Sequence, residues 1–450
     1  MSLPFDAIPG PPRRWWGLPL LRAMARDYLG HCEALQRRHG DLVRVPILAE
    51  RTLDLFHPEL AREALVEQAD ALVRWRRGPE VFAEISGQNV LVTEGDTWRR
   101  QRRLLMQAFT PRKVAGYARL MTDAAAAGLD AALPAGADAA EVDMDALFSG
   151  LAMDVILHTL FGSAAGADAR ASAAAVRRLG EIGFREMFWP RTLPDWLPLP
   201  GKAAKRRALR QLRGLIAGHL ARPEAARGDT LLAMLRAVRD DESGAALAEQ
   251  EIFDQCMIGF LAGHETSATA LTWWAALLAR DEAAAARATD EVDRVLRGAV
   301  PGPEHVAALP WLGATLKEAM RLYPPIAALM TRRTTRPITL GGHAVPARTL
   351  LRVTPWVLQR DARFFAAPER FDPARFMPEA EPPARGAYLP FGIGPRVCLG
   401  QHFALLEMTL IGALLLQRLR ITPTAEPLPP PRLHVTLRPR QAVRLRLQRR

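Results

Sequence analysis

Apolar side chains recur at the spacing of one helix face over much of the chain between about residues 58 and 322. The clearest helical segments are residues 98–107, 144–161, 171–187, 202–220 and 250–278. Prolines interrupt this pattern between residues 188 and 201, and proline cannot continue a helix. We therefore expect a long helical region with an ordered loop at 188–201.

Short segments rich in β-branched and aliphatic residues lie outside the helical region. They fall at about 41–56 and 327–353, and alternating apolar and polar residues predict a closing hairpin within 433–448. No repeat or flexible Gly/Ser linker divides the chain. The sequence predicts a mainly α fold with a small β-rich part, and one domain over residues 1–450.

The amino terminus is broken by prolines and charges, unlike a secretory signal or a membrane anchor. No uninterrupted apolar run reaches the ~18–20 residues of a spanning helix. Cys32, Cys256 and Cys398 contain no Cys-x-x-Cys pair, which argues against a disulfide framework, a zinc ribbon and covalent haem attachment. We expect a cytoplasmic protein with reduced thiols, in which Cys32 and Cys256 are small buried hydrophobes.

The formal net charge of +12 raises the question of nucleic-acid binding. The arginines are scattered, however, and lack the interleaved aromatic residues of a groove for single strands. Joint enrichment in alanine and arginine is typical of GC-rich coding sequence, so composition explains part of the charge. We expect no nucleic-acid partner; an acidic protein is a better match for a basic face.

A glycine-punctuated loop at residues 391–400 delivers Cys398 to the start of an apolar helix that is predicted to run to about residue 416. Glycine permits tight turns and the close approach of a flat ligand. A thiol at a helix amino terminus feels the positive end of the helix dipole, which favours the thiolate. Such a thiolate is a strong electron-donating ligand for haem iron; the alternative is a structural cysteine in a Gly-rich loop.

The long helix predicted at 250–278 carries a second candidate site. His264 and Glu265 match part of a zinc-protease motif, but that motif needs a second histidine four residues after the first, where the chain has Ala268. The sequence therefore excludes this kind of zinc site.

Ile258, Ala262 and Thr266 recur every four residues and share one face of that helix. The small side chain of Ala262 and the following Gly263 leave room beside a planar cofactor. Glu265 and Thr266 supply an acid and a hydroxyl through which protons can be relayed. The alternative is an inert helix in which Thr266 bonds to the carbonyl four residues earlier.

Two charge clusters complete the candidate chemistry. Glu318 and Arg321 are three residues apart on a predicted helix, and Arg370 downstream would complete a buried Glu–Arg–Arg network. The alternative for this pair is a surface ion pair. Trp98 and Arg102 are four residues apart and share a face suited to gripping a carboxylate, with a solvated basic helix as the alternative.

In combination and in this order, these features closely resemble the haem-thiolate monooxygenases of the cytochrome P-450 family. The pattern Phe-x-x-Gly-x-Arg-x-Cys-x-Gly is complete at 391–400, and the Ala-Gly-x-Glu-Thr, Glu-x-x-Arg and Trp-x-x-x-Arg motifs are intact. One small departure is Gln359, where many relatives have histidine. The resemblance covers essentially the whole chain. It implies the cytochrome P-450 fold, with haem between the long central helix and the cysteine-bearing helix.

The resemblance implies a b-type haem with Cys398 as its proximal iron ligand, and Glu265 and Thr266 as the residues that handle oxygen activation. The residues implied to contact the haem are Trp98, Arg102, Ala262, Arg332 (with Arg333 as the alternative), Phe391, Gly392, Arg396, Cys398 and Gly400. The residues implied to form the structural network behind the haem are Glu318, Arg321 and Arg370. By resemblance to bacterial fatty-acid hydroxylases, the implied pocket residues are Leu91, Ile258, Leu261, Ala262, Thr266, Ile326 and Val435.

The implied activity inserts one atom of O2 into a substrate, by hydroxylation or epoxidation, and reduces the other to water. Nearly all implied pocket residues are apolar, which leaves fatty acids, terpenoids, steroids and aromatic compounds as candidate substrates. Residues 188–201 and the flanking helices would form a movable lid.

The resemblance further implies electrons from separate proteins, a ferredoxin with its reductase or a flavodoxin-type donor, docked around the cysteine loop of a monomer. Two alternatives remain: a haem-thiolate peroxygenase or isomerase that needs no reductase, and a non-catalytic haem sensor.

Overall fold

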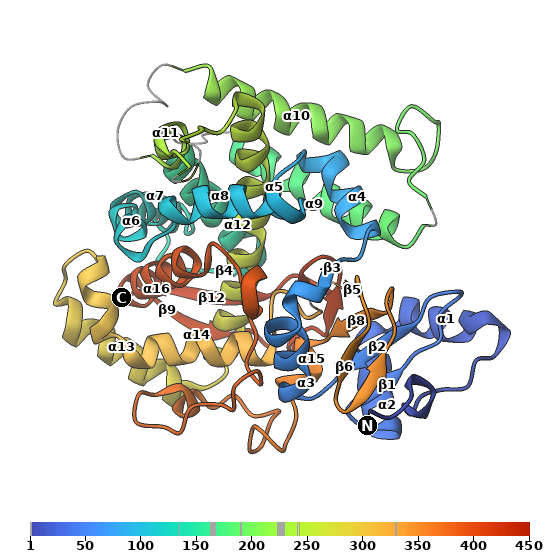
Figure 1. Cartoon of the computed structure of the whole chain (residues 1–450). Helices are drawn as coiled ribbons and strands as arrows, with labels where there is room; N and C mark the ends of the chain where they lie inside the picture. The colour runs from blue at the N-terminus through green and yellow to red at the C-terminus, as the bar shows by residue number, and fades with distance from the viewer. Residues whose placement is uncertain are drawn as a thin grey trace. The chain divides into compact units, whose positions relative to one another are not determined.

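The computed structural model describes residues 2–134, 136–162, 168–189, 191–222, 230–240, 242, 244–328 and 331–450, without the side chains of residues 168–171. Backbone contacts divide the chain into two units, which are drawn together in Figure 1. Unit 1 comprises Met1–Gly78, Arg321–Phe371 and Glu381–Cys398. Unit 2 comprises Pro79–Met320, Asp372–Ala380 and Leu399–Arg450.

Unit 1 contains a five-stranded sheet with the strand order β1-β2-β8-β5-β3. Its strands are β1 (Leu42–Arg44), β2 (Thr52–Leu55), β3 (Leu72–Arg74), β5 (Arg332–Thr334) and β8 (Leu350–Val353). β2 and β8 pair in parallel, while the other neighbours pair antiparallel. A separate hairpin joins β6 (Ile338–Leu340) to β7 (His343–Val345). The predicted β-rich segments at 41–56 and 327–353 are thereby confirmed.

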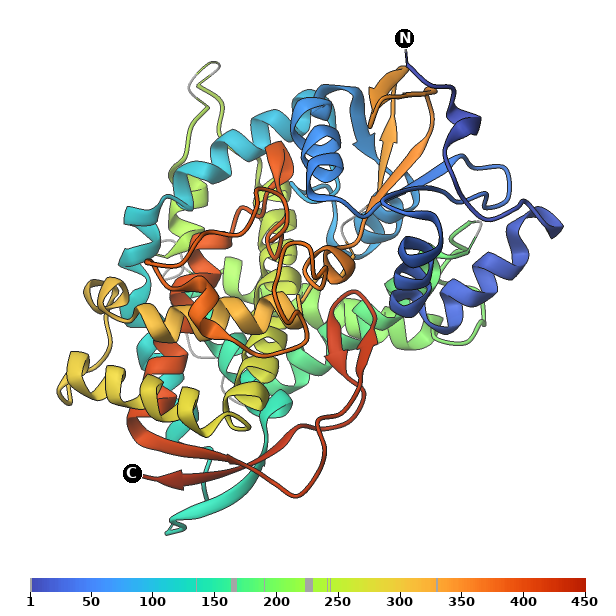
Figure 2. The ribbon, with the colours of Figure 1, turned by 90° about the horizontal axis from the view of Figure 1, so that it is seen from below.

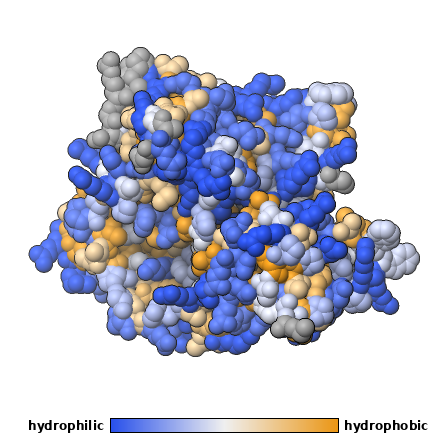
Figure 3. All heavy atoms as spheres, in the orientation of Figure 1, coloured by the Kyte–Doolittle hydropathy of each residue, from blue (hydrophilic) through white to orange (hydrophobic). Residues whose placement is uncertain are grey.

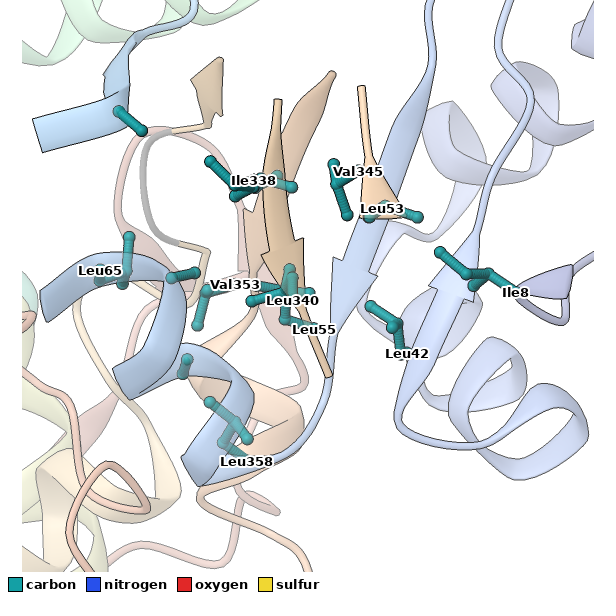
Figure 4. Close-up of a cluster of buried hydrophobic side chains, with 14 of the residues drawn as sticks. Ile8, Leu42, Leu53, Leu55, Leu65, Ile338, Leu340, Val345, Val353 and Leu358 are labelled. Carbon is teal, nitrogen blue, oxygen red and sulfur yellow. The ribbon is translucent and has the colours of Figure 1, made fainter. Parts of the chain in front are cut away.

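Helices and short turns cover this sheet. They are η1 (Phe5–Ala7), η2 (Trp15–Gly17), α1 (Leu18–Arg26), α2 (Tyr28–His39), α3 (Pro58–Arg62), the π-helical turn η3 (Glu63–Glu67), η4 (Ala69–Ala71), α15 (Pro355–Leu358) and η8 (Gly394–Arg396). Figure 4 shows the core between the strands and these helices, where Leu53, Leu55 and Val353 meet Leu65 and Leu358. All five side chains are at most 7% exposed, so burial of apolar surface holds the sheet and its helices together.

Unit 2 is mainly helical. Its helices are α4 (Arg77–Ser86), α5 (Gly95–Ala108), α6 (Pro111–Gly116), α7 (Ala118–Asp130), α8 (Met144–Phe161), α9 (Asp168–Met187), α10 (Lys202–Leu220), α11 (Leu231–Ala237), α12 (Glu249–Leu278), α13 (Glu282–Leu296), η6 (Pro303–Ala308), α14 (Pro310–Leu322), η7 (Pro373–Phe376) and α16 (Gln401–Arg418). α12 is the central helix and packs against α8, α10, α11 and α16. Its fully buried Trp273 and Trp274 satisfy their indole N–H groups with the Leu437 carbonyl and the Thr315 hydroxyl.

The carboxyl-terminal strands correct one prediction. β12 (Arg444–Arg449) does not close a hairpin with residues 434–437; it lies between β4 (Ala139–Asp143) and β9 (Leu419–Pro423), as Figure 2 shows. The hairpin in this region joins β10 (Pro431–Leu433) to β11 (Leu437–Pro439). Residues 434–436 therefore form its turn. The alternation at 443–446 reflects burial of one face of β12, and alternation alone does not identify the partner strand.

The strongest helical patterns are confirmed. α8 and α10 have the predicted bounds, and α12 begins one residue earlier than predicted. Two strands, β3 and β4, were missed inside the helical region. β4 has the sequence Ala-Ala-Glu-Val-Asp, of low strand propensity, and it is extended because it pairs with β12 some three hundred residues later.

One helix in the part of the chain that the structure describes, α8, passes the length and composition test for a membrane span, with a mean hydropathy of 1.4. Asp145, Asp154 and His158 interrupt its apolar run, which is why the sequence alone did not indicate it. Within the structure 67% of α8 is buried. It packs against α7, α9 and α12, as the core helix of a folded domain does.

Figure 3 shows one face of the molecule, on which hydrophilic residues predominate and apolar residues reach the surface in separate patches.

The interior of unit 2 contains a buried carboxyl group. Glu407 on α16 is 1% exposed and accepts a hydrogen bond of 2.6 Å from the Ser267 hydroxyl on α12. Burial raises the pKa of Glu407 to about 8, because the apolar surroundings disfavour the charged form.

This carboxyl should make stability depend on pH. Its folded pKa of about 8 exceeds the ordinary value of 4.5, so the folded state binds more protons than the unfolded state between these two values. The free energy of unfolding therefore falls as pH rises through this window, by at most about 1.4 kcal/mol per pH unit from this group. Glu407→Gln removes that dependence. Urea unfolding from pH 5 to pH 9 should show that the free energy of unfolding of the variant rises relative to that of the wild type as pH increases. If the two free energies change with pH in the same way, the pKa assigned to Glu407 is wrong.

Candidate active site

The loop that carries Cys398 is tightly held within unit 1. Gly392 and Gly394 adopt left-handed φ angles of 76° and 78°. A Cβ on Gly394 would lie 2.1 Å from the carbonyl oxygen of Leu65, so no larger residue fits. The Cys398 amide donates a hydrogen bond of 2.9 Å to the Phe391 carbonyl, which closes the loop. The two glycines thus allow the loop to pass close to the Leu65 carbonyl.

Cys398 differs from the other two cysteines in exposure. Its side chain is exposed, whereas Cys32 and Cys256 are 0% exposed. Burial raises the pKa of both buried thiols to about 12, which keeps them protonated at neutral pH. Because a thiolate is the metal-binding form, Cys398 is the cysteine suited to bind iron. The prediction that Cys32 and Cys256 are buried hydrophobes is confirmed.

Strand β5 brings two arginines together in unit 1. Arg332 lies directly opposite Arg74 on β3, so their side chains share one face of the sheet. Arg333 faces the other way and donates a hydrogen bond of 2.7 Å to Glu50. Arg332 and Arg74 therefore place two cationic side chains on one face of the sheet, where positive charge favours an anionic ligand, and Arg333 pairs with Glu50 on the other face. The sequence analysis did not single out Arg74, because its position opposite Arg332 follows from the pairing register of β3 and β5, which only the structure provides.

In unit 2, Trp98 and Arg102 lie on one face of α5. The Arg102 guanidinium carbon is 5.9 Å from the centre of the Trp98 ring. Both side chains are partly buried. The shared face predicted from their spacing is present in the structure.

The central helix α12 has one unusual position in unit 2. Ala262 is the only exposed residue between Glu251 and Leu278. Leu261 and Thr266 beside it are partly buried, and Ile258 is 8% exposed. The Thr266 hydroxyl donates to the Ala262 carbonyl at 2.8 Å, the back-bond that the inert-helix alternative described. Thr266 thus holds its proton on the same face as the exposed Ala262.

Glu265 faces away from this position. Its carboxylate accepts hydrogen bonds from the Thr436 hydroxyl at 2.7 Å and from Arg438 Nε at 3.0 Å. Glu265 and Arg438 are each 8% exposed, so this is a buried ion pair that ties α12 to β11. Neither Thr436 nor Arg438 was singled out in the sequence. The structure gives Glu265 a cationic partner beyond the acid–Thr pairing inferred from the motif.

The predicted Glu–Arg–Arg network needs a correction. The second arginine at Glu318 is Arg375, whose Nε lies 3.2 Å from the Glu318 carboxylate, and not Arg370. The Glu318 carboxylate also accepts from the amide of Asp372 at 2.9 Å. The Arg370 side chain is exposed, and Arg370 contributes only its backbone carbonyl, to Arg321 at 3.2 Å. The turn η7 carries Arg375 to the buried carboxylate, a placement that no local pattern indicates.

Gln359 proves central to the cysteine loop's support in unit 1. Fully buried Arg321 donates to the Gln359 carbonyl at 2.7 Å, and the Gln359 amide group donates back to the Arg321 carbonyl at 2.9 Å. The Gln359 side-chain oxygen accepts from the amide of Leu389, just before the loop, at 2.8 Å. Gln359, where many relatives have histidine, therefore has partners for its backbone carbonyl, its side-chain N–H and its side-chain oxygen.

The predicted pocket residues divide between the units, with Ile326 in unit 1 and the other six in unit 2. Leu91, Ile326 and Val435 are partly buried. An open pocket of about 320 Å³ near the start of α12 contains none of them and is lined by Ile85, Ser86, Gly87, Gln88, Arg213, Gln250, Phe253, Asp254 and Met257. Several of those side chains are polar, so we do not assign this pocket to an apolar substrate.

Ion pairs hold the predicted lid between α9 and α10 in unit 2. Lys202 and Lys205 are at most 1% exposed and flank buried Glu186 at 2.7 and 2.8 Å. Asp195, inside the loop, lies 2.7 Å from Lys202 and 3.2 Å from Lys205. Glu84 on α4 completes the cluster at 2.9 Å from Lys205. Two of the chain's few lysines therefore fasten the loop to both helices.

Comparison with known proteins places this site in a family. The cytochrome P-450 family model matches residues 8–445. Cyclooctatin synthase of Streptomyces melanosporofaciens is 37% identical over 90% of this chain and 89% of its own length. Cyclooctat-9-en-7-ol 5-monooxygenase of the same organism is 31% identical over 92% of this chain and 91% of its own length. Pentalenene oxygenase of Streptomyces avermitilis is 32% identical over 88% of this chain and 89% of its own length.

The chain belongs to the cytochrome P-450 family. Its largely helical structure with small sheets is the cytochrome P-450 fold. It is a cytochrome P-450 monooxygenase that uses a haem-iron cofactor, O2 and redox partners, and it acts on an apolar substrate.

The residues of this cytochrome P-450 fit a haem. Unit 1 supplies an exposed thiol in a rigid loop and the cationic Arg74–Arg332 pair, which suits a carboxylate-bearing ligand. Within unit 2, considered by itself, α12 has one small exposed residue, Ala262, that leaves room for a planar group. Among the residues that the structure describes, no three His, Cys, Asp or Glu side chains gather as metal ligands. A haem iron with one protein thiolate needs no such cluster.

The cysteine loop provides a test of this fit. Gly394→Ala should strain the left-handed backbone and collide with Leu65, which lowers the free energy of unfolding by at least about 1–2 kcal/mol and displaces the sulfur. We expect most of the haem content to be lost, measured as the ratio of Soret to protein absorbance. Gly214→Ala is the matched control, since its Cβ meets nothing within 4 Å on α10. Normal haem content in the Gly394 variant would contradict this account.

The lid cluster provides a second test. Glu186→Gln removes a buried negative charge between Lys202 and Lys205, which leaves their ammonium groups undercompensated. Loss of one member of a buried ion pair costs about 3–5 kcal/mol, so the urea midpoint should fall markedly. Glu181→Gln is the matched control, because Glu181 and its partner Arg178 are 38% and 57% exposed. Equal effects of the two variants would show that the cluster does not stabilise the lid.

Proposed function

We propose that this monooxygenase hydroxylates or epoxidises a terpenoid. The support comes from three relatives of 31–37% identity that align over nearly the whole chain, two of which are named as oxygenases of terpenoid compounds. The helix face around Ala262 is compatible with such a substrate, since Ile258 and Leu261 present only hydrocarbon there. Fatty acids, steroids and aromatic compounds are the alternatives that the test below separates.

We propose haem b as the cofactor. When bound, the haem iron supplies the activation of O2 that allows one oxygen atom to enter the substrate. The Cys398 thiolate would bind the iron, while Arg332 and Arg74 of unit 1 would neutralise propionate charge. The other residues proposed to contact the haem are Trp98, Arg102, Ala262, Phe391, Gly392, Arg396 and Gly400.

Thr266 is the residue we propose to move a proton during the reaction. Its Oγ1 holds one proton in the bond to the Ala262 carbonyl and can reorient toward a new acceptor, because a hydroxyl rotates freely about its C–O bond. We propose that Glu265 assists from its place beside Arg438, with Thr436 as the hydroxyl through which the carboxylate can exchange a proton.

Electrons would come from a ferredoxin with its reductase, or from a flavodoxin-type donor, docked near the cysteine loop. The net charge of +12 favours an acidic partner, since complementary charge accelerates encounter. We propose a cytoplasmic monomer in which residues 1–450 act as one functional domain.

A ligand panel tests the proposal. Terpenoids, fatty acids, steroids and aromatic compounds are titrated into the haem-loaded protein while the Soret band is followed. We expect the largest shift with terpenoids, and an oxygenated terpenoid product when O2, ferredoxin, reductase and NADPH are supplied. A larger response to another class would replace the terpenoid assignment. Turnover supported only by peroxide would favour a peroxygenase, and binding without any product would favour a sensor.

Two cysteine variants serve as controls in this panel. Cys398→Ala should lose the thiolate-type Soret band of the reduced, CO-bound protein, and product formation with it. Cys256→Ala should keep both, because Cys256 is a buried thiol whose raised pKa keeps it protonated. A thiolate-type band in the Cys398 variant would overturn the ligand assignment without affecting the choice of substrate.

A further inference from the structure

The amino-terminal part of unit 1 exposes large apolar side chains. Trp15 and Trp16 are 81% and 68% exposed, and Leu18 and Leu48 are 54% and 47% exposed. We call these four residues the tryptophan patch. Single exposed apolar residues need no explanation, but a contiguous group that includes two tryptophans marks an interaction surface.

The backbone holds the tryptophan patch outward at a conformational cost. Trp15, Trp16 and Leu48 have φ angles of 46°, 58° and 52°, in the left-handed region that bulky residues rarely adopt. The Leu48 amide donates to the Trp16 carbonyl at 2.8 Å, which joins the two segments of the patch. A Cβ on Gly17 would lie 2.2 Å from the Pro46 carbonyl oxygen, so the turn packs tightly beneath the rings. Strain of this kind is typical of functional surfaces.

Arginines surround the tryptophan patch. Arg13 donates to the Leu48 carbonyl at 3.1 Å and lies 5.6 Å from the centre of the Trp16 ring. Arg14, Arg22 and Arg26 are exposed and form no ion pair with any residue in the described part of the chain. Figure 1 shows α1, which carries two of them, at the outer edge of unit 1.

The acidic residues near the patch have other partners. Glu50 pairs with Arg333 at 2.7 Å, and Asp27 caps α2 by accepting from Gly30 at 3.0 Å. The surroundings of the tryptophans are therefore cationic.

We propose that the tryptophan patch docks this cytochrome P-450 onto the surface of an anionic lipid bilayer. Tryptophan has an apolar body and a polar N–H, and it concentrates at the membrane–water boundary. Arginines beside such rings are attracted to anionic headgroups, each by about a tenfold change in binding at most. The patch has four residues, few beside the roughly 20–30 residues that each partner contributes to a stable protein interface. Docking there would place the enzyme where apolar compounds accumulate, whatever its substrate class.

Vesicle flotation of the haem-loaded protein tests the proposal. Vesicles of phosphatidylglycerol and phosphatidylcholine in equal parts should carry the protein upward, and vesicles of phosphatidylcholine alone should carry much less. Rising salt should weaken the binding, because it screens the arginines. Trp15→Ala with Trp16→Ala should weaken binding to the anionic vesicles by about tenfold or more, since two interfacial anchors are lost. An unchanged Soret band and urea midpoint show that this variant is folded.

Charge variants supply a matched pair. Arg14→Gln with Arg22→Gln should lower binding to the anionic vesicles, whereas Arg444→Gln with Arg446→Gln removes the same charge from exposed positions of β12 and should not. Two results would overturn the proposal: no flotation of the wild type with anionic vesicles, or equal flotation of the tryptophan variant. A tryptophan variant that floats normally but is reduced more slowly by an acidic ferredoxin would reassign the patch to a protein partner.

Discussion

The contact between Gly394 and the Leu65 carbonyl is the constraint on which the active site of this cytochrome P-450 depends. A backbone oxygen occupies the space where any side chain would begin, so the loop has only one way to pass η3. The hydrophobic core that fixes η3 also includes Leu389 and has Ile393 packed against it, on either side of the loop's first turn. The position of the sulfur is therefore determined by the sheet core of unit 1 rather than by the loop itself.

Burial of charge shapes unit 2 in a similar way. Glu265, Glu186 and Glu318 are each at most 8% exposed, and each has a basic partner on another helix, strand or turn. A buried charge that loses its partner is far more costly than one exposed to water, so each pair restricts which segments can separate. The central helix, the loop between α9 and α10 and the turn that carries Arg375 are consequently held by polar contacts as well as by apolar packing.

Sequence reasoning predicted what depends on local pattern. Helices α8 and α10 and the glycine loop followed from periodicity and residue type, because those signals lie within a few turns of chain. It could not predict the strand pairing of β12, the partner of Glu318 or the face shared by Arg74 and Arg332, because each depends on which distant segment lies alongside. Glu265 shows the limit most clearly: the motif indicated an acid, and only the fold provided Arg438.

The unequal exposure of the three cysteines has a consequence for the life of the protein in the cell. Cys32 and Cys256 are shielded from oxidants by burial, whereas Cys398, the thiol that we propose as the iron ligand, is exposed. A solvent-accessible thiol is oxidised more readily than a buried one, first to the sulfenic acid and then irreversibly to higher acids. Coordination to iron would protect the sulfur from this oxidation. Cys398 is thus the cysteine at which oxidative damage and loss of the proposed ligand would coincide.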